Sequence, residues 1–259
     1  MIEANALFTI AYRDFVKLLR DPARIAATFV FPILFIGILG GSLQANLGQV
    51  AGYNLLEFVF TGVLAQTVFS STASGIISLI EDRENDFSQE IFISPISRYS
   101  IVFGKILGES LVAFPQGAAI IAFGWLVRVP LSIPRTLAMA PVGLLICLFG
   151  GAFGLIVLSN LKSQRAANQV FPFIMFPQYF LAGVFSPIAV LPWYLEILSR
   201  LTPLRYAVDL LRGIYYAGTP QYNDVVLAPP LNNLAVMGVM FTVFMVAGTY
   251  LFVRGERNR

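Results

Sequence analysis

The stretch EDRENDFSQEIFISPISR, residues 81–98, separates two long apolar stretches, and five of the chain's fourteen acidic residues lie in its first ten positions. Between Arg24 and Glu81, by contrast, the only Asp, Glu, Lys or Arg is Glu57. A charged insert of this length cannot bury a hydrophobic core of its own. It therefore predicts a surface segment that meets a partner.

The composition around this insert is that of a membrane protein, because 57% of the residues are apolar and 12% are charged, whereas soluble domains contain about 25% charged residues. A net charge of +3 is too low for the dense basic face that binds nucleic acid. The chain has no histidine, which excludes a histidine-based metal site or catalytic dyad, and its one cysteine, Cys147, cannot form an internal disulfide. We expect membrane lipid as the surroundings, no nucleic-acid partner and no metal site.

Six segments meet the requirement of about 20 largely apolar residues for a membrane-spanning helix. They are residues 25–43, 58–80, 104–127, 137–159, 169–186 and 231–253. We therefore predict an all-α membrane protein with six transmembrane helices in one domain, 1–259. An even number of spans places both termini on the same side of the membrane.

The basic residues orient these spans. With cytoplasmic termini, twelve basic residues lie inside: Arg13, Lys17, Arg20, Arg24, Arg83, Arg98, Lys105, Lys162, Arg165, Arg254, Arg257 and Arg259. Five lie outside: Arg128, Arg135, Arg200, Arg205 and Arg212. The positive-inside rule favours this orientation and makes 81–98 cytoplasmic. Residues 1–24, where apolar and basic residues alternate at helical spacing, predict an interfacial amphipathic helix rather than a cleavable signal; an ordinary helix packed on the bundle is the alternative.

The outer segment 187–222 predicts two short helices. Thr202 followed by Pro203 has the pattern of an N-cap with proline at the first helical position, and Gly218 is a plausible stop. Arg205, Asp209 and Arg212 lie at i, i+4 and i+7, so two ion pairs can form on one face. Arginines are costly at the centre of a bilayer, which favours a re-entrant hairpin in the outer leaflet over a seventh span.

Two spans carry candidate pathway residues. Gln66, Ser70, Ser74 and Ser78 repeat every four residues of the second span, so they share a face that either lines a pathway or packs closely on another helix. In the fifth span, which we expect to be kinked at its two prolines, an aromatic cluster could line a site for an apolar molecule or serve as core or lipid contact. Its candidate lining residues are Phe176, Gln178 and Tyr179.

Two further pairs point to structure rather than transport. Gly150 and Gly154 have GxxxG spacing, which predicts a helix contact in the fourth span. Lys105 and Glu109 form an i, i+4 pair near the cytoplasmic end of the third span, and we interpret it as structural.

Catalytic motifs are missing from the sequence. It contains no HExxH, no GxSxG and no Walker A motif. We also find no carboxylate pair deep in the spans that would couple transport to protons or sodium. The chain is therefore expected not to be an enzyme, and its energy source is expected on another chain.

The chain resembles the permease subunits of ATP-binding-cassette type-2 exporters. The resemblance rests on the order of these features and on three stretches of sequence. The stretches are EDRENDFSQEIFISPISR (81–98), FPFIMFPQYFLAGVFSPIAVLPWYL (171–195) and LTPLRYAVDLLRG (201–213), the last with Thr202 where asparagine is common in the family. The resemblance covers essentially the whole chain. It implies a homodimer or pseudo-dimer above two cytoplasmic ATPase subunits, which bind ATP and Mg, in a bacterial or archaeal inner membrane.

The resemblance also gives 81–98 a role, that of a coupling helix seated on the ATPase. Its coupling residues would be Glu81, Asp82, Arg83, Glu84, Asp86, Phe87, Glu90, Ile91, Pro95 and Arg98. From the residues themselves, Phe87 and Ile91 lie at i, i+4 and can form an apolar ridge, the acids can pair with basic residues of a partner, and Pro95 should end the helix. A merely solvated acidic surface is the alternative.

The family exports two kinds of cargo, amphipathic drugs or antibiotics and lipid-linked glycans or lipo-oligosaccharides. The polar side chains within the spans are concentrated in the second helix, and most of them carry hydroxyl groups. This pattern favours a hydrophobic or amphipathic small molecule as the cargo. A stand-alone ion-coupled carrier is a third possibility, and Glu109 is the one plausible titratable group for it within the spans.

Overall fold

The structure is a computed structural model that describes residues 29–49, 52–84, 98–158, 161 and 163–257, together with residues 9, 12 and 16. Every regular element in these ranges is a helix. The elements are η1 (Ile33–Gly40), α3 (Gly41–Leu47), α4 (Leu55–Gly75), α5 (Ile77–Glu84), α7 (Arg98–Leu126), α8 (Ile133–Leu158), α9 (Gln164–Leu181), η2 (Ile188–Val190), α10 (Trp193–Leu201), α11 (Pro203–Tyr215), α12 (Tyr222–Val225) and α13 (Pro230–Arg257). The all-α prediction is confirmed for the described chain.

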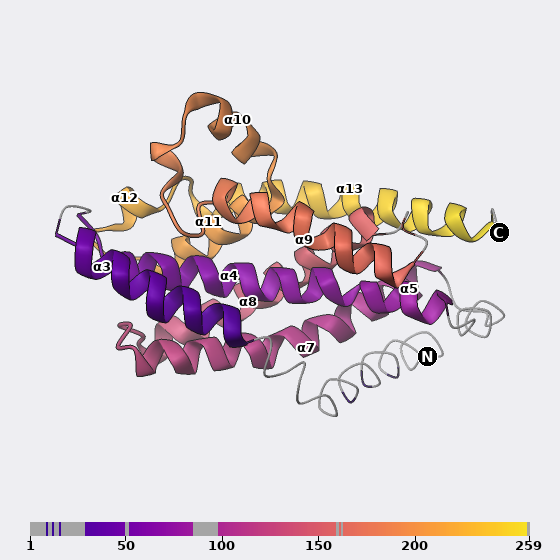
Figure 1. The fold of residues 1–259 in the computed structure, drawn as a ribbon, viewed down its shortest axis with the longest axis horizontal. Coiled ribbons are helices and arrows are strands. Elements are labelled where there is room, and N and C mark those ends of the chain that lie inside the picture. Colours follow the sequence, from indigo (N-terminus) through magenta and orange to yellow (C-terminus); the bar gives the residue numbers. More distant parts are fainter. Residues whose placement is uncertain are drawn as a thin grey trace.

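The long helices α4, α7, α8, α9 and α13 run along the length of the molecule (Figure 1). α5 and the C-terminal end of α13 lie at one end, while α12 and the turn between α7 and α8 lie at the other. α10 projects from the side of the bundle. This arrangement separates the end that leads into residues 85–97 from the end that carries the short helices.

Five segments are long and apolar enough to cross a membrane: Phe29–Leu47, Leu55–Glu81, Ser100–Leu126, Ile133–Leu158 and Tyr222–Arg254. They match five of the six predicted spans to within a few residues at most ends, although the last begins nine residues before its predicted start at 231. The remaining prediction, 169–186, falls on α9, whose first turns carry polar side chains such as Gln164, Arg165 and Asn168. A six-span count therefore stays a prediction.

α4 is the central helix of the bundle, and it packs against α7, α8, α11 and η1. Asn54 caps its first turn, because the side-chain oxygen accepts hydrogen bonds from the backbone N–H groups of Leu56 (3.0 Å) and Glu57 (3.3 Å). Most of its residues from Leu55 to Gly75 are buried. The helix is interrupted at Ile76, and α5 continues it as far as Glu84.

Gly150 and Gly154 allow α8 to pack directly on the α4 backbone. A Cβ atom on Gly150 would overlap the carbonyl of Phe69, and one on Gly154 would overlap the carbonyl of Ala73. The helix contact predicted from the GxxxG spacing is confirmed.

Substituting alanine at Gly150 or Gly154 should therefore destabilise the protein by about 1–3 kcal/mol, because the two helices must move apart. Gly143→Ala on the same helix is the matched control. A Cβ at Gly143 meets nothing within 4 Å, so this change should be neutral or should stabilise the helix by about 1 kcal/mol. Thermal unfolding in detergent measures all three, and equal stability of the three variants would contradict the close packing.

Several predicted features lie partly or wholly outside the described residues. Of the N-terminal helix, 1–24, only residues 9, 12 and 16 are described, and these are helical. In α9 the two prolines, Pro172 and Pro177, lie inside one continuous helix, which ends at Leu181, before Gly183 at φ +72°. The predicted fifth span, 169–186, therefore ends five residues after the helix does, because the glycine conformation ends the helix first.

Candidate functional site

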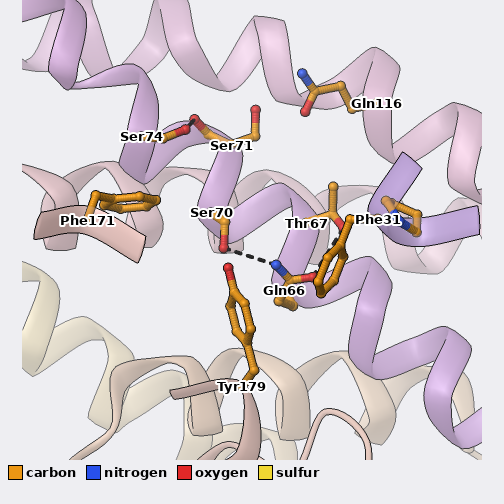
Figure 2. Close-up of a pocket in the computed structure, with 10 residues that line it drawn as sticks. Phe31, Gln66, Thr67, Ser70, Ser71, Ser74, Gln116, Phe171 and Tyr179 are labelled. Atoms are coloured by element: carbon orange, nitrogen blue, oxygen red, sulfur yellow. Dashed lines mark hydrogen bonds between the residues drawn. The ribbon is translucent and has the colours of Figure 1, made fainter. Parts of the chain in front are cut away.

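A cavity of about 300 Å³ opens in the surface beside the central helix. Four parts of the chain line it: the segment before η1, α4, α7 and α9. The lining residues are Phe31, Pro32, Gln66, Thr67, Ser70, Ser71, Ser74, Gln116, Phe171 and Tyr179 (Figure 2). It combines residues that lie up to about 150 positions apart in the sequence.

One wall of this cavity is polar and comes from α4. Gln66 donates from Nε2 to the hydroxyl of Ser70 at 3.3 Å, as Figure 2 shows, and Ser74 donates to the backbone carbonyl of Ser71 at 3.0 Å. The hydroxyl of Thr67 lies 3.4 Å from the side-chain oxygen of Gln66. The side-chain oxygen of Gln116, on α7, is buried with no hydrogen-bond partner among the described residues. The wall therefore offers hydroxyl and amide groups without a formal charge.

Aromatic side chains from the other elements complete the lining of the cavity. The ring of Phe31 lies 5.8 Å from that of Tyr179, centroid to centroid, and stacks on Phe35 at 4.1 Å. Phe35 in turn stacks on Phe185 at 4.7 Å. Such ring pairs are favoured and hold the wall in a defined shape. A molecule in this cavity would meet both hydrogen-bonding groups and aromatic rings.

The predicted pathway residues do not all meet at this cavity. Four line it: Gln66, Ser70, Ser74 and Tyr179. Ser78 lies outside its lining and donates to the carbonyl of Gly75 and to Oε1 of Glu109 (3.0 Å). The remaining two, both on α9, also lie outside it: Phe176 is 62% exposed and Gln178 is buried.

Six lining residues were not among the predicted set: Phe31, Pro32, Thr67, Ser71, Gln116 and Phe171. Thr67 and Ser71 are four residues apart and belong to the same polar run of the second span, so the helical spacing could have identified them. Gln116 is an isolated polar residue in an apolar span, which is also a usable signal. No spacing in the sequence identifies Phe31, Pro32 and Phe171 as lining residues. They line the cavity because of how the helices pack in three dimensions.

The predicted coupling segment is described only at its ends. Glu81 is half-buried at the end of a candidate span, Asp82, Arg83 and Glu84 complete α5, and Arg98 begins α7. Asp86, Phe87, Glu90, Ile91 and Pro95 lie outside the described residues. α5 contacts α9 and follows directly on α4, so the segment is joined to the helix that supplies the polar wall of the cavity.

Lys105 and Glu109, the pair predicted in the third span, are both buried near the C-terminal end of α4. Lys105 is 1% exposed and Glu109 is 2% exposed. The hydrogen bond from Ser78 connects Glu109 to the start of α5, immediately after the interruption at Ile76. Glu109 therefore contacts the junction between α4 and α5.

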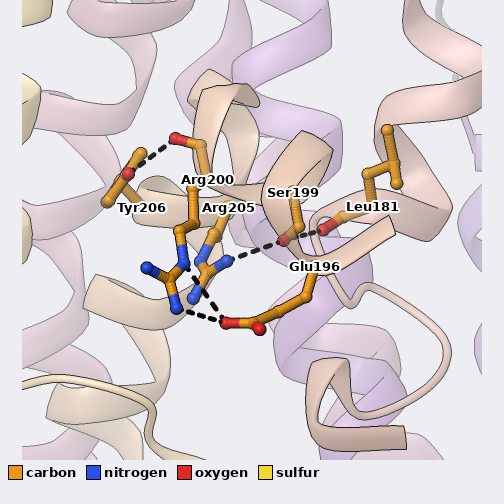
Figure 3. Close-up of polar contacts among 6 residues, drawn as sticks. All are labelled: Leu181, Glu196, Ser199, Arg200, Arg205 and Tyr206. Atoms are coloured by element: carbon orange, nitrogen blue, oxygen red, sulfur yellow. Dashed lines mark hydrogen bonds and ion pairs between the residues drawn. The ribbon is translucent and has the colours of Figure 1, made fainter. Parts of the chain in front are cut away.

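The short helices α10 and α11 form the predicted hairpin, and Thr202 is the N-cap residue of α11 with Pro203 at its first position. Figure 3 shows how the hairpin is attached to the end of α9. Ser199 donates to the carbonyl of Leu181 at 2.6 Å and accepts from Arg205 at 2.9 Å. An exposed ion pair, Arg200 with Glu196 at 2.7 Å, lies on the outer side of α10.

The two ion pairs expected among Arg205, Asp209 and Arg212 do not form between these described residues. Asp209 instead accepts from the N–H groups of Leu227 (2.8 Å) and Ala228 (3.0 Å) and from the amide of Asn233 (2.7 Å). The carboxylate thus fixes the entry to α13. These three donors satisfy the carboxylate of Asp209, and they leave the N–H groups of Leu227 and Ala228 paired in the segment before α13.

Arg212 is 3% exposed and extends from α11 into the core. It donates to the carbonyls of Phe58 (3.0 Å) and Val184 (3.5 Å), approaches the hydroxyl of Thr61 at 3.4 Å, and lies 3.6 Å from the ring centroid of Phe58. Burial lowers the pKa of Arg212 to about 10, so the side chain stays cationic at neutral pH. This one side chain connects α11 to α4 and to the segment that follows α9.

The chain is similar to a family of known proteins. A family model described as "ABC-2 type transporter" matches residues 5–216. The putative transport permease ycf38 of Cyanophora paradoxa is 26% identical over 213 residues, which are 81% of this chain and 73% of that protein. The inner membrane transport permease YadH of Escherichia coli K12 is 23% identical over 87% of this chain and 86% of its own length. The probable multidrug ABC transporter permease YbhR of the same strain is 29% identical over 54% of this chain and 38% of its own length.

Proposed function

This chain belongs to the ABC-2 type transporter family, and from that premise we propose that it is the membrane subunit of an ATP-driven exporter. The substrate in this proposal is a hydrophobic or amphipathic small molecule, such as a drug, an antibiotic or a lipid-like compound, that leaves the cytoplasm or the inner leaflet. The observation that carries the proposal is the cavity beside α4, whose lining combines hydroxyl and amide groups with aromatic rings. Ligand sites typically combine a largely apolar lining with a few polar groups that orient the ligand.

The name of one relative, a probable multidrug transporter permease, agrees with this class of substrate. Export of a lipid-linked glycan or lipo-oligosaccharide is the alternative. A glycan could use the same hydroxyl and amide groups, but it would be expected to need stacking rings along its whole path. In this cavity of about 300 Å³ the rings of Phe31, Phe171 and Tyr179 lie among the polar groups of α4. Its volume is that of a site for a drug-sized ligand, which favours the small molecule.

Energy for transport comes, in this proposal, from two ATPase subunits that bind ATP and Mg, and this chain is not itself an enzyme. Residues 81–98 are, in this proposal, the cytoplasmic coupling segment that docks on the ATPase. Support comes from the chain order, since α5 leads from the polar wall of α4 into this segment. A displacement of the segment would therefore act directly on the helix that lines the cavity.

We further propose six spans, with α9 as the fifth, and both termini on the cytoplasmic side of a bacterial or archaeal inner membrane. The hairpin of α10 and α11 would then be re-entrant in the outer leaflet. The chain would act as a dimer with a second permease copy. Large apolar side chains on the outer faces of α9 and α10 support this assembly: Phe173 is 81% exposed, Phe176 62% and Trp193 75%. A second copy or lipid must cover them.

Ser70→Phe tests the cavity, because the added ring would occupy part of its volume of about 300 Å³. We expect substrate-stimulated ATPase activity in liposomes to fall about tenfold, equivalent to about 1.4 kcal/mol of lost binding. Basal ATPase activity and assembly with the ATPase should be unchanged. The matched control is Thr242→Phe, which adds the same ring at an exposed position of α13.

Three results would count against the proposal. Equal substrate stimulation of ATPase activity in Ser70→Phe and Thr242→Phe would show that the substrate does not bind in this cavity. If lipid-linked glycans stimulate the ATPase activity and no amphipathic small molecule does, the substrate is a glycan. Transport that persists without any ATPase subunit and follows a proton gradient would make the chain a stand-alone carrier.

A further inference from the structure

A second cavity, of about 180 Å³, lies between α7 and α8, with α4 and α11 behind it. It shares no lining residue with the cavity beside the polar face of α4. Its α7 side includes Phe114, Ala118 and Ile121, and its α8 side includes Leu137, Ala140 and Gly143. The lining is thus almost entirely apolar. Apolar cavities of roughly 150 Å³ stay dry and accept apolar ligands.

This apolar groove opens on the surface of two candidate membrane spans. Phe114 is 46% exposed and Leu137 is 67% exposed, so the opening faces hydrocarbon when the chain is in a bilayer. Along α8 the lining runs from Thr136 to Cys147, which is about 16 Å at 1.5 Å per residue. A single leaflet contributes about half of a hydrocarbon core roughly 30 Å thick. The length of the groove therefore matches one leaflet.

Positive charge lies at the same end of the groove as Thr136. Arg135 directly precedes Thr136, and its guanidinium donates to the carbonyl of Pro130 at 3.1 Å and lies 5.2 Å from the ring centroid of Tyr215. The Tyr215 hydroxyl donates to Glu57 at 2.9 Å, so this carboxylate offsets part of the Arg135 charge.

Arg128, in the turn between α7 and α8, is exposed and forms no ion pair with any described residue. It is also the one non-glycine residue with positive φ, +64°, in the described chain. This conformation is unfavourable for a side chain with a Cβ, and such strain often accompanies functional positions. The turn thus presents a cation at the depth where lipid head groups lie.

We infer that the apolar groove between α7 and α8 binds one acyl chain of an anionic phospholipid, whose phosphate lies beside Arg128 and Arg135. The occupant follows from the two parts of the site. One is an apolar groove of leaflet length, and the other is a pair of arginines, Arg135 next to the lining residue Thr136 and Arg128 in the turn before α8. Phosphate and guanidinium form strong charge-assisted hydrogen bonds. The Thr136 hydroxyl, which is buried with no hydrogen-bond partner in the described chain, then has an ester carbonyl of the lipid as its acceptor.

Native mass spectrometry of the purified full chain tests this site with dioleoyl phosphatidylglycerol and dioleoyl phosphatidylcholine as probes. The wild type should retain one phosphatidylglycerol per chain in preference to phosphatidylcholine. Gly143→Leu should abolish this retention, because a Cβ there meets nothing within 4 Å and the side chain fills the groove. Gly238→Leu, at an equally open glycine of α13, is the control that should keep the lipid.

The charge is tested separately. The double substitution Arg128→Gln with Arg135→Gln should remove the preference between the two lipids and leave the groove intact. If Gly143→Leu does not fold, Ala118→Trp from the facing helix takes its place. Unchanged retention in the groove variant, equal loss in Gly238→Leu, or equal binding of both lipids by the wild type would overturn the inference.

Discussion

Glu90→Arg or Phe87→Ala is expected to abolish the coupling between ATP hydrolysis and transport, while each variant still inserts into the membrane. Both residues belong to the proposed coupling segment, and both lie outside the described residues. Removing a buried aromatic anchor from an interface typically costs about 2 kcal/mol or more, which is a loss of roughly 30-fold in affinity. Reversing the charge of Glu90 would place a cation against basic residues of the partner and add repulsion.

Co-purification with the ATPase and substrate-stimulated ATPase activity in liposomes measure this effect, after membrane fractionation has established insertion. Gln89→Arg is the matched control, because position 89 is about 200° from Phe87 around a helix and lies away from the ridge. It introduces the same side chain and should preserve coupling. Full coupling in both Glu90→Arg and Phe87→Ala would rule out this docking surface. Loss in all three variants would show that the effect is not confined to the ridge of Phe87 and Ile91.

The fold was largely predictable because hydrophobic spacing and helix capping are local properties. The second span was predicted at 58–80, and the structure begins it at Leu55, where the Asn54 cap satisfies the first N–H groups. The prolines of the fifth span gave a weaker prediction. A proline removes one backbone hydrogen bond, but the rest of the hydrogen-bond ladder remains, and α9 is continuous from Gln164 to Leu181.

The candidate site was predictable only on its polar side. Serine and glutamine at four-residue spacing identify the wall on α4, because one helix supplies all of it. The aromatic wall depends on Phe31, before η1, coming to lie beside Tyr179 on α9, and no periodicity in the sequence relates the two positions. The predicted ion pairs of α11 were wrong for a related reason, since buried backbone groups from distant segments compete for Asp209 and Arg212.

Arg212→Met is expected to destabilise the protein more than any other single change in the hairpin. The guanidinium is buried and donates to two backbone carbonyls, those of Phe58 and Val184. The Phe58 carbonyl also accepts from the Thr61 hydroxyl at 3.0 Å, so it keeps a donor when Arg212 is replaced. Hydrogen bonds to a charged group contribute about 1.5–3 kcal/mol each. Allowing for partial relaxation, we expect a loss of about 3 kcal/mol, or roughly 6–12 °C in the unfolding midpoint.

The control for this change is Arg200→Met, which removes the same type of side chain from the exposed pair with Glu196. Exposed ion pairs contribute about 0–1 kcal/mol, so its unfolding midpoint in detergent should stay close to that of the wild type. Arg212→Lys should recover part of the stability. Its ammonium group can donate to one of the two carbonyls, but it lacks the planar set of donors with which a guanidinium reaches both. If Arg212→Met melts at the same temperature as Arg200→Met, the contacts of Arg212 do not stabilise the protein measurably. The connection from α11 to the first turns of α4 would then have to come from other contacts, such as the hydrogen bond from Tyr215 to Glu57 at 2.9 Å.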